Sequence, residues 1–195
     1  SGSLQLFRIE NGWHNSLYSG TASGFTVGTY YNLKVSFEGS TIKIWGNGTL
    51  IKEYNDAYQY YGSSYNKVAI GTYNISAPIW FDDTQVTALQ NDKFTIIQPN
   101  TTFTPLADGG TWDMADDGTG DVGYRQRAFG GSLYHTSKFV SGKTLDGSIT
   151  ADVRIDGNAS SDQAYLYFRM SADYKYGYAI GISYSGNLNL YKVSN

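Results

Sequence analysis

Two eleven-residue segments at opposite ends of the chain have nearly the same sequence. Residues 1–11 read SGSLQLFRIEN and residues 185–195 read SGNLNLYKVSN, with five identical positions and three like-for-like exchanges. Residue 1 aligns with residue 185, so the two segments are about one domain length apart. The simplest interpretation is that the chain covers slightly more than one period of a repeating protein, beginning inside one copy and ending inside the next.

The composition favours β-structure. Aromatic residues make up 16% of the chain, with 18 Tyr, and such residues fit pleated surfaces well. Apolar residues alternate with polar ones over short runs that end at Gly, Asn, Asp or Ser, and no window keeps a helical spacing. The sequence therefore predicts an all-β fold, an antiparallel β-sandwich.

Charge and hydropathy argue against several partners. The net charge is −3 with 16% charged residues, so the chain has no basic stripe for nucleic acid. It also has no apolar run of about 18 residues, and we expect no membrane-spanning segment. The absence of Cys excludes disulfides and thiol chemistry.

Alternating segments predict individual strands on both sides of a weakly patterned stretch. Residues 88–105 contain two of the three prolines and are interpreted as a junction. An Asn-Gly pair at 47–48 predicts a two-residue hairpin turn. The expected strands are 4–10, 13–18, 31–37, 41–45, 49–54, 67–73 and 79–86 before the junction, and 111–114, 122–124, 132–135, 148–155, 163–170, 178–184 and 188–193 after it.

Two parts of the sequence resemble one known family. YYNLKVSFEGSTIKIWGNGTLIKEYND (30–56) and NKVAIGTYNISAPIWFDDTQVT (66–87) are similar to the closing half of concanavalin A-like, laminin G-like jelly-roll domains of microbial surface proteins. Residues 111–195, with ADVRID, YLYFRMS and GYAIGIS, resemble the opening half. The resemblance implies a permuted jelly roll, with residues 1–87 as the closing half, 88–105 as the junction and 106–195 as the opening half.

One jelly roll has a single place for the duplicated strand. The surplus copy would present unpaired backbone groups and an apolar face, and a neighbouring chain or repeat is the obvious partner. We therefore expect subunits to associate with copies of themselves through this strand. The junction is expected to be held by main-chain hydrogen bonds and by apolar burial of Leu4, Leu6 and Ile9 in the first copy, or of Leu188, Leu190 and Val193 in the second.

The sequence contains no catalytic constellation. His14 and His135 lie far apart and have no spacing typical of metal ligands or of a nucleophile's base. Glucanases of the broader fold resemble Glu-x-Asp-x-x-Glu on one strand, and the three Glu residues of this chain do not match that pattern. We predict that the protein is not an enzyme.

Aspartates in two places could bind calcium. The resemblance implies that Asp82 and Asp83, at the end of a Phe-Asp-Asp strand, contribute to a structural calcium site, to which Asp116, Asp117 and Asp121 could add oxygen ligands. The alternative is that these residues end strands and form Asx turns.

Aromatic residues leave two further interpretations open. Stacking against sugars would make the chain a carbohydrate-binding module, whereas burial in the core or at an interface is the ordinary role of Tyr. The candidate rings are Tyr54, Tyr58, Tyr60, Tyr61 and Tyr65, with Trp13, Trp45 and Trp80.

Four Asn-x-Ser/Thr sequons are compatible with a secreted or cell-surface glycoprotein. They begin at Asn47, Asn74, Asn100 and Asn158, all in expected turns or loops. The leading hypothesis is a non-catalytic, extracellular, structural or adhesive repeat that assembles end to end by β-strand exchange. A carbohydrate-binding, lectin-like module is the alternative, and an enzyme comes third.

Overall fold

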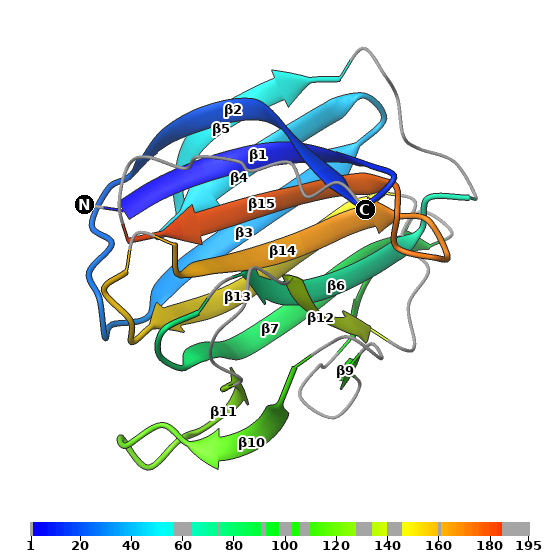
Figure 1. The fold of residues 1–195 in the computed structure, drawn as a ribbon. Helices are drawn as coiled ribbons and strands as arrows, with labels where there is room; N and C mark the ends of the chain where they lie inside the picture. Colours follow the sequence, from blue (N-terminus) through cyan, green and yellow to red (C-terminus); the bar gives the residue numbers. More distant parts are fainter. Residues whose placement is uncertain are drawn as a thin grey trace.

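The computed structural model describes residues 2–56, 64–73, 75–90, 93–97, 103–105, 110–127, 134–139, 146–159 and 161–184. Within these ranges all regular secondary structure is β-strand, and every strand pair is antiparallel (Figure 1). Two sheets pack face to face, which confirms the predicted all-β sandwich. The described residues include no helix that could cross a bilayer.

The first sheet has seven strands among the described residues. Their spatial order is β2-β1-β15-β14-β6-β12-β9. The bounds in that order are β2 (Trp13–Ala22), β1 (Gly2–Glu10), β15 (Gly177–Ser183), β14 (Gln163–Met170), β6 (Lys67–Tyr73), β12 (Tyr134–Phe139) and β9 (Phe103–Pro105).

The second sheet has eight described strands. Seven follow the order β10-β11-β7-β13-β3-β4-β5, and β8 pairs with β7 beside this path. The bounds are β10 (Trp112–Asp116), β11 (Val122–Gln126), β7 (Ile79–Gln90), β13 (Gly147–Ile155), β3 (Tyr31–Glu38), β4 (Thr41–Gly46), β5 (Thr49–Asn55) and β8 (Lys93–Ile97).

Each sheet contains strands from both the first and the last part of the chain, lying beside one another. In the first sheet β14 and β15 lie between β6 and β1, and in the second sheet β13 lies between β7 and β3. One buried cluster between the sheets contains Leu4 and Leu33 from the first part of the chain and Ile149 and Leu166 from the last. Residues 1–87 and 106–195 thus share one core, and neither supplies a whole sheet of its own.

The described parts of the expected junction at 88–105 contain strands that its weak pattern does not indicate. β8 folds back on the end of β7, with Gln90 opposite Lys93, and β9 pairs with β12. Pairing along a sheet edge satisfies backbone groups whatever the side chains are, so it needs no apolar alternation. The sequence pattern could not reveal these two strands for that reason.

Two Asn-Gly pairs make the tight turns that their sequence predicts or allows. Asn47 and Gly48 have φ of 47° and 75°, between Gly46 and Thr49, which face each other across the β4–β5 hairpin. The 11–12 pair has φ of 51° and 81° and joins β1 to β2. Left-handed values at both positions are typical of the type I′ turn, which Asn-Gly favours.

Candidate functional site

β1 is held between two strands of its own chain. It pairs with β15 from Ser3 opposite Ser183 to Ile9 opposite Gly177, and with β2 along its whole length. Figure 1 shows that the start of β1 and the end of β15 lie at the same end of the sheet. We call the place between β15 and β2 the β1 slot.

The side chains of β1 are buried on both faces of the sheet. Leu4 and Leu6 point into the core between the sheets, and each is fully buried. Ile9 lies on the opposite face in a second cluster with Phe7, because residues an odd number of positions apart point to opposite sides of a strand. Leu4, Leu6 and Ile9 are thus all buried, but on two faces of the strand.

Burial of this kind makes the slot a strong binding place for a strand. Each fully buried Leu or Ile side chain contributes about 1.5–3 kcal/mol relative to an exposed one. The second copy, with Leu188, Leu190 and Val193, lies outside the described residues.

Local sequence explains how β1 enters and leaves the slot. A Cβ on Gly2 would lie 2.6 Å from the Phe25 Cδ1 atom and 2.9 Å from the Ser183 carbonyl oxygen, so only glycine fits there. At the other end the Gly12 N–H donates to the Lys175 carbonyl, 2.8 Å away. This bond ties the β1–β2 turn to the loop that precedes β15.

Asp82 and Asp83 lie in an irregular part of β7. The pairing of β7 with β13 shifts register here, and Asp83 has a positive φ of 42°. The Asp83 N–H donates to Asp82 Oδ1 at 2.8 Å. Burial, followed by the nearby charges of Asp121, Asp83 and Asp152, raises the pKa of Asp82 above its usual range.

Asp116 and Asp117 form a compact turn after β10. Asp116 Oδ1 accepts hydrogen bonds from the N–H groups of Gly118 and Gly120, at 2.7 and 3.3 Å. Asp117 Oδ1 accepts from the Thr119 N–H and hydroxyl, and these bonds are the main reason that the pKa of Asp117 is lowered. Both carboxylates thus make the Asx-turn contacts that were the alternative to calcium.

Asp117 also faces a cation on the outer surface of the second sheet. Arg154 donates to its carbonyl and carboxylate at 3.0 and 3.4 Å, and only 1% of the Asp117 side chain is exposed. Among the described residues no three His, Cys, Asp or Glu side chains lie together as a metal site would require. The calcium site stays a prediction.

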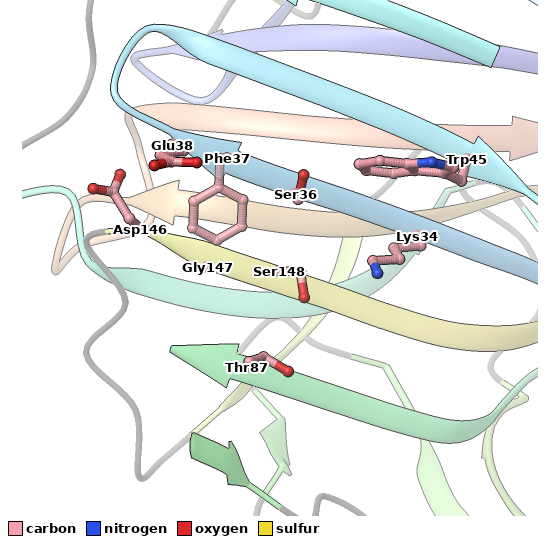
Figure 2. Close-up of a pocket in the computed structure, with 9 residues that line it drawn as sticks. All are labelled: Lys34, Ser36, Phe37, Glu38, Trp45, Thr87, Asp146, Gly147 and Ser148. Carbon is pink, nitrogen blue, oxygen red and sulfur yellow. The ribbon is translucent and has the colours of Figure 1, made fainter. Parts of the chain in front are cut away.

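The same outer surface has a shallow pocket of about 350 Å³ (Figure 2). Small ligand sites begin at roughly this size. Its lining comes from β3, β4, β7 and β13, so rigid neighbouring strands position it. The lining residues are Lys34, Ser36, Phe37, Glu38, Trp45, Thr87, Asp146, Gly147 and Ser148.

The pocket combines one aromatic face with hydroxyl and charged groups. The Lys34 ammonium lies 5.3 Å from the centre of the Trp45 ring, which is half-buried. Ser36 and Ser148 stand on the same side of the sheet as this ring in Figure 2. Hydroxyls and a cation beside an indole face can bind a sugar by hydrogen bonds and stacking.

The other candidate rings differ from Trp45. Trp80 is 4% exposed and lies between two guanidinium groups, those of Arg125 at 4.9 Å and Arg154 at 4.7 Å. Tyr54 and Tyr65 are half-buried, and Tyr54 packs against the core. The side chain of Trp13, and residues 58, 60 and 61, lie outside what the structure describes.

Trp45 is the one lining residue of the pocket that the sequence indicates as a candidate. Its polar members recur at alternate positions of β3 and β13, a pattern that marks any solvent-facing strand side. What distinguishes them is that they converge across strands distant in sequence. No spacing within the sequence carries that signal.

Two of the four sequons lie in described residues. Asn47 is exposed in the β4–β5 turn, where its Oδ1 accepts the Asn32 N–H at 3.0 Å. Asn158 is exposed after β13. Asn74 and Asn100 lie outside the described residues, and the use of all four sequons stays a prediction.

Comparison of the sequence with protein-family models and with curated proteins finds no match. The resemblance to concanavalin A-like jelly rolls therefore stays an interpretation of the motifs. The two-sheet sandwich stands on the structure alone.

Proposed function

We propose that this chain is a non-catalytic structural or adhesive repeat of an extracellular protein, whose copies join end to end by exchange of a β-strand. The observation that carries the proposal is the β1 slot. It holds one strand, and the chain has two near-identical sequences for it. The neighbour is another copy of this chain or the next repeat of one polypeptide.

Exchange at this slot would use forces that salt and reductant do not weaken. β1 is held by main-chain pairing on both sides and by buried apolar side chains. Apolar burial and internal hydrogen bonds are screened far less than surface ion pairs. With no Cys in the chain, no disulfide can lock the junction.

The balance between monomer and filament then depends on concentration. Replacing one copy of the strand by the other conserves the pairs within each sandwich, so the exchange itself releases little free energy. The free energy that favours the filament must therefore come from mass action and from new contacts between neighbouring copies. A head-to-tail contact that does not close produces an open fibre.

Deletion of residues 1–11 tests the assembly. We expect the full chain to form species that grow with concentration, in low and high salt alike, when sized by light scattering. A chain without residues 1–11 has one strand for one slot and should stay monomeric. Deletion of residues 185–195 is the reciprocal test: it also leaves one strand for one slot and should have the same effect.

Two results would refute the proposal. One is a full chain that stays monomeric at the highest concentration reached. The other is polymerisation of both truncated chains to the same extent as the full chain. Electron microscopy of the native material would show directly whether it is fibrous.

A carbohydrate-binding module is the second candidate, and the pocket beside Trp45 favours it. Replacing Trp45 by Ala removes the aromatic face while leaving the strand pairing of β4 intact. We expect micromolar-to-millimolar binding on a glycan array to be lost in this variant. Met114→Ala, an exposed apolar change on β10 at the other end of the second sheet, is the control.

Calcium would act in this proposal as a structural ion. If Asp82 is a ligand, added calcium raises the melting temperature of the parent chain and has a smaller effect on Asp82→Asn. Asp173→Asn is a control far from this turn, because its carboxylate bonds Ser171 and Lys175 instead. Equal melting curves with calcium and with a chelator would remove calcium from the proposal.

A further inference from the structure

The pairing of β1 with β15 has a register that can be transferred to the second copy of the strand. Ser3 faces Ser183, and Ile9 faces Gly177. Residue 3 aligns with residue 187 and residue 9 with residue 193. In the same slot and register, Asn187 would face Ser183 and Val193 would face Gly177.

That register leaves three residues between the paired positions. Ser183 ends β15, and the residues between it and Asn187 are Tyr184, Ser185 and Gly186. Three-residue hairpin loops are a common connection and place glycine at their last, left-handed position. The chain has Gly186 there. The register of β1 is thus the one that a hairpin from β15 would impose.

The most demanding positions of the slot are unchanged in the second copy. Gly2 also aligns with a glycine, but in the hairpin Gly186 is the last loop residue, so the correspondence within the slot begins at Asn187. Leu4 and Leu6, fully buried in the core, correspond to leucines as well. Asn11, which has a φ of 51°, corresponds to Asn195.

Six positions differ between the two copies, including Ser3, which is 2% exposed and becomes Asn. Phe7 becomes Tyr on the outer face, where its neighbour at 5.9 Å is already the tyrosine Tyr165. Gln5 becomes Asn beside Ser19. Glu10, half-buried near the end of the strand, becomes Ser.

We propose that the β1 slot is a receptor for residues 187–193 of the same chain, which enter it as a hairpin from β15 and release β1. Asn195 then takes the place of Asn11 beside the β2 strand. Released β1 is the segment available to a neighbouring copy. The inference rests on the proposed strand exchange in naming β1 as the donated strand, but its test concerns the folding of a monomer.

A chain with only the second copy of the strand provides the test. Residues 103–195 are joined directly to residues 12–97, so that Asn195 precedes Gly12 and restores an Asn-Gly turn. The new ends replace the connection between β8 and β9. We expect a monomer that unfolds cooperatively, with a melting temperature within a few degrees of the parent chain without residues 185–195.

Engineered cysteines report the register, because the chain has no native Cys. In this permuted chain Ala179→Cys with Tyr191→Cys places the thiols on directly opposite residues, as Phe7 and Ala179 are now. Oxidised glutathione should convert this pair to an intramolecular disulfide. The control pair, Ala179→Cys with Asn189→Cys, is two residues out of register and should react much more slowly.

A second permuted chain carries residues 1–11 in place of 185–195. If this chain folds and the first does not, residues 187–193 do not fit the slot and the inference is wrong. If both fail to fold, the hairpin connection itself is incompatible, which also overturns it. Equal cross-linking of the two cysteine pairs refutes the register. None of these results depends on whether the full chain polymerises, so the proposed assembly can fail separately.

Discussion

The outer faces of the two sheets differ in how deeply their side chains are buried, although residues alternate between the two faces of a strand in both sheets. In β13, of the second sheet, buried and half-buried residues alternate from end to end. In β14, of the first sheet, all eight residues are buried. The alternation of residues within 148–155 and within 163–170 predicts a half-buried strand in both places, and for β14 that prediction is wrong.

The reason is the kind of residue at the outward positions. β13 directs Ser148, Thr150, Asp152 and Arg154 outward, and these side chains are half-buried. The outward residues of β14 include Tyr165 and Tyr167, which pack with the outward Phe7 of β1. A tyrosine can be exposed or buried, so alternation alone does not decide which sheet has two apolar faces.

The largest expected effect comes from the buried outer face. Tyr165 is fully buried, and its ring meets Phe7 edge to face at 5.9 Å. Tyr165→Ala leaves a cavity and should lower the free energy of unfolding by about 3–5 kcal/mol. Chemical denaturation followed by fluorescence measures this change.

Thr150→Ala is the matched change on the other sheet. It lies at an outward, half-buried position of β13 and should change the free energy of unfolding by less than about 0.5 kcal/mol. Similar values for the two variants would show that the outer faces do not differ in the way that burial indicates.

Within the second sheet, a buried ion pair of Arg154 can be compared with an exposed ion pair. Arg154 is 11% exposed, covers the Trp80 ring and pairs with Asp117 and Asp156. Arg154→Ala removes the guanidinium that pairs with the buried Asp117 carboxylate. We expect a loss of about 1–3 kcal/mol in the free energy of unfolding.

The Lys43–Glu53 pair provides the exposed counterpart. Its side chains are 41% and 56% exposed at a separation of 3.3 Å. Lys43→Ala should cost no more than about 1 kcal/mol, because solvent screens such pairs. The double change of Arg154→Ala with Asp117→Asn should recover part of the loss, and a larger loss in the double variant would contradict this account.

A structural feature can be predicted from the sequence when the residues that produce it lie close together in the chain. The strands β3 and β4 follow the alternation of their own residues, and the Asn47-Gly48 turn follows from two residues. The pocket is lined by Trp45 of β4 and Ser148 of β13, two strands that flank β3 in the sheet but lie far apart in the chain. Contacts of that kind require the strand order, which no local pattern contains.

The buried Arg169 shows again that contacts between distant residues cannot be predicted from local sequence. Arg169 is 1% exposed, and its guanidinium donates to the Gly39 carbonyl and to Asp146, joining one sheet to the other. In the sequence it is one charged residue in an apolar run, as a solvent-facing residue of a strand would be. Its partners are separated from it by 130 and 23 residues, so nothing nearby reveals its role.

The smallest expected effect concerns pH at the edge of the second sheet. Arg125 and Arg127 lie 2.9 and 2.8 Å from the Asp113 carboxylate, and the hydrogen bond from Arg125 is the main cause of its lowered pKa. The native state thus favours the ionised form. This contribution is complete above the unfolded pKa of about 3.9 and is lost as the pH falls through that value toward the lower native pKa.

Asp113→Asn removes the contribution at every pH. Because the Asp113 side chain is 31% exposed, the variant should lose less than about 1 kcal/mol at pH 7. Near pH 3 the gap between parent and variant should narrow, since protonation has begun to remove the same interaction from the parent. Denaturation curves at the two pH values measure the gap. A gap that widens in acid would mean that Asp113 is stabilised in its protonated form, contrary to the two arginine contacts.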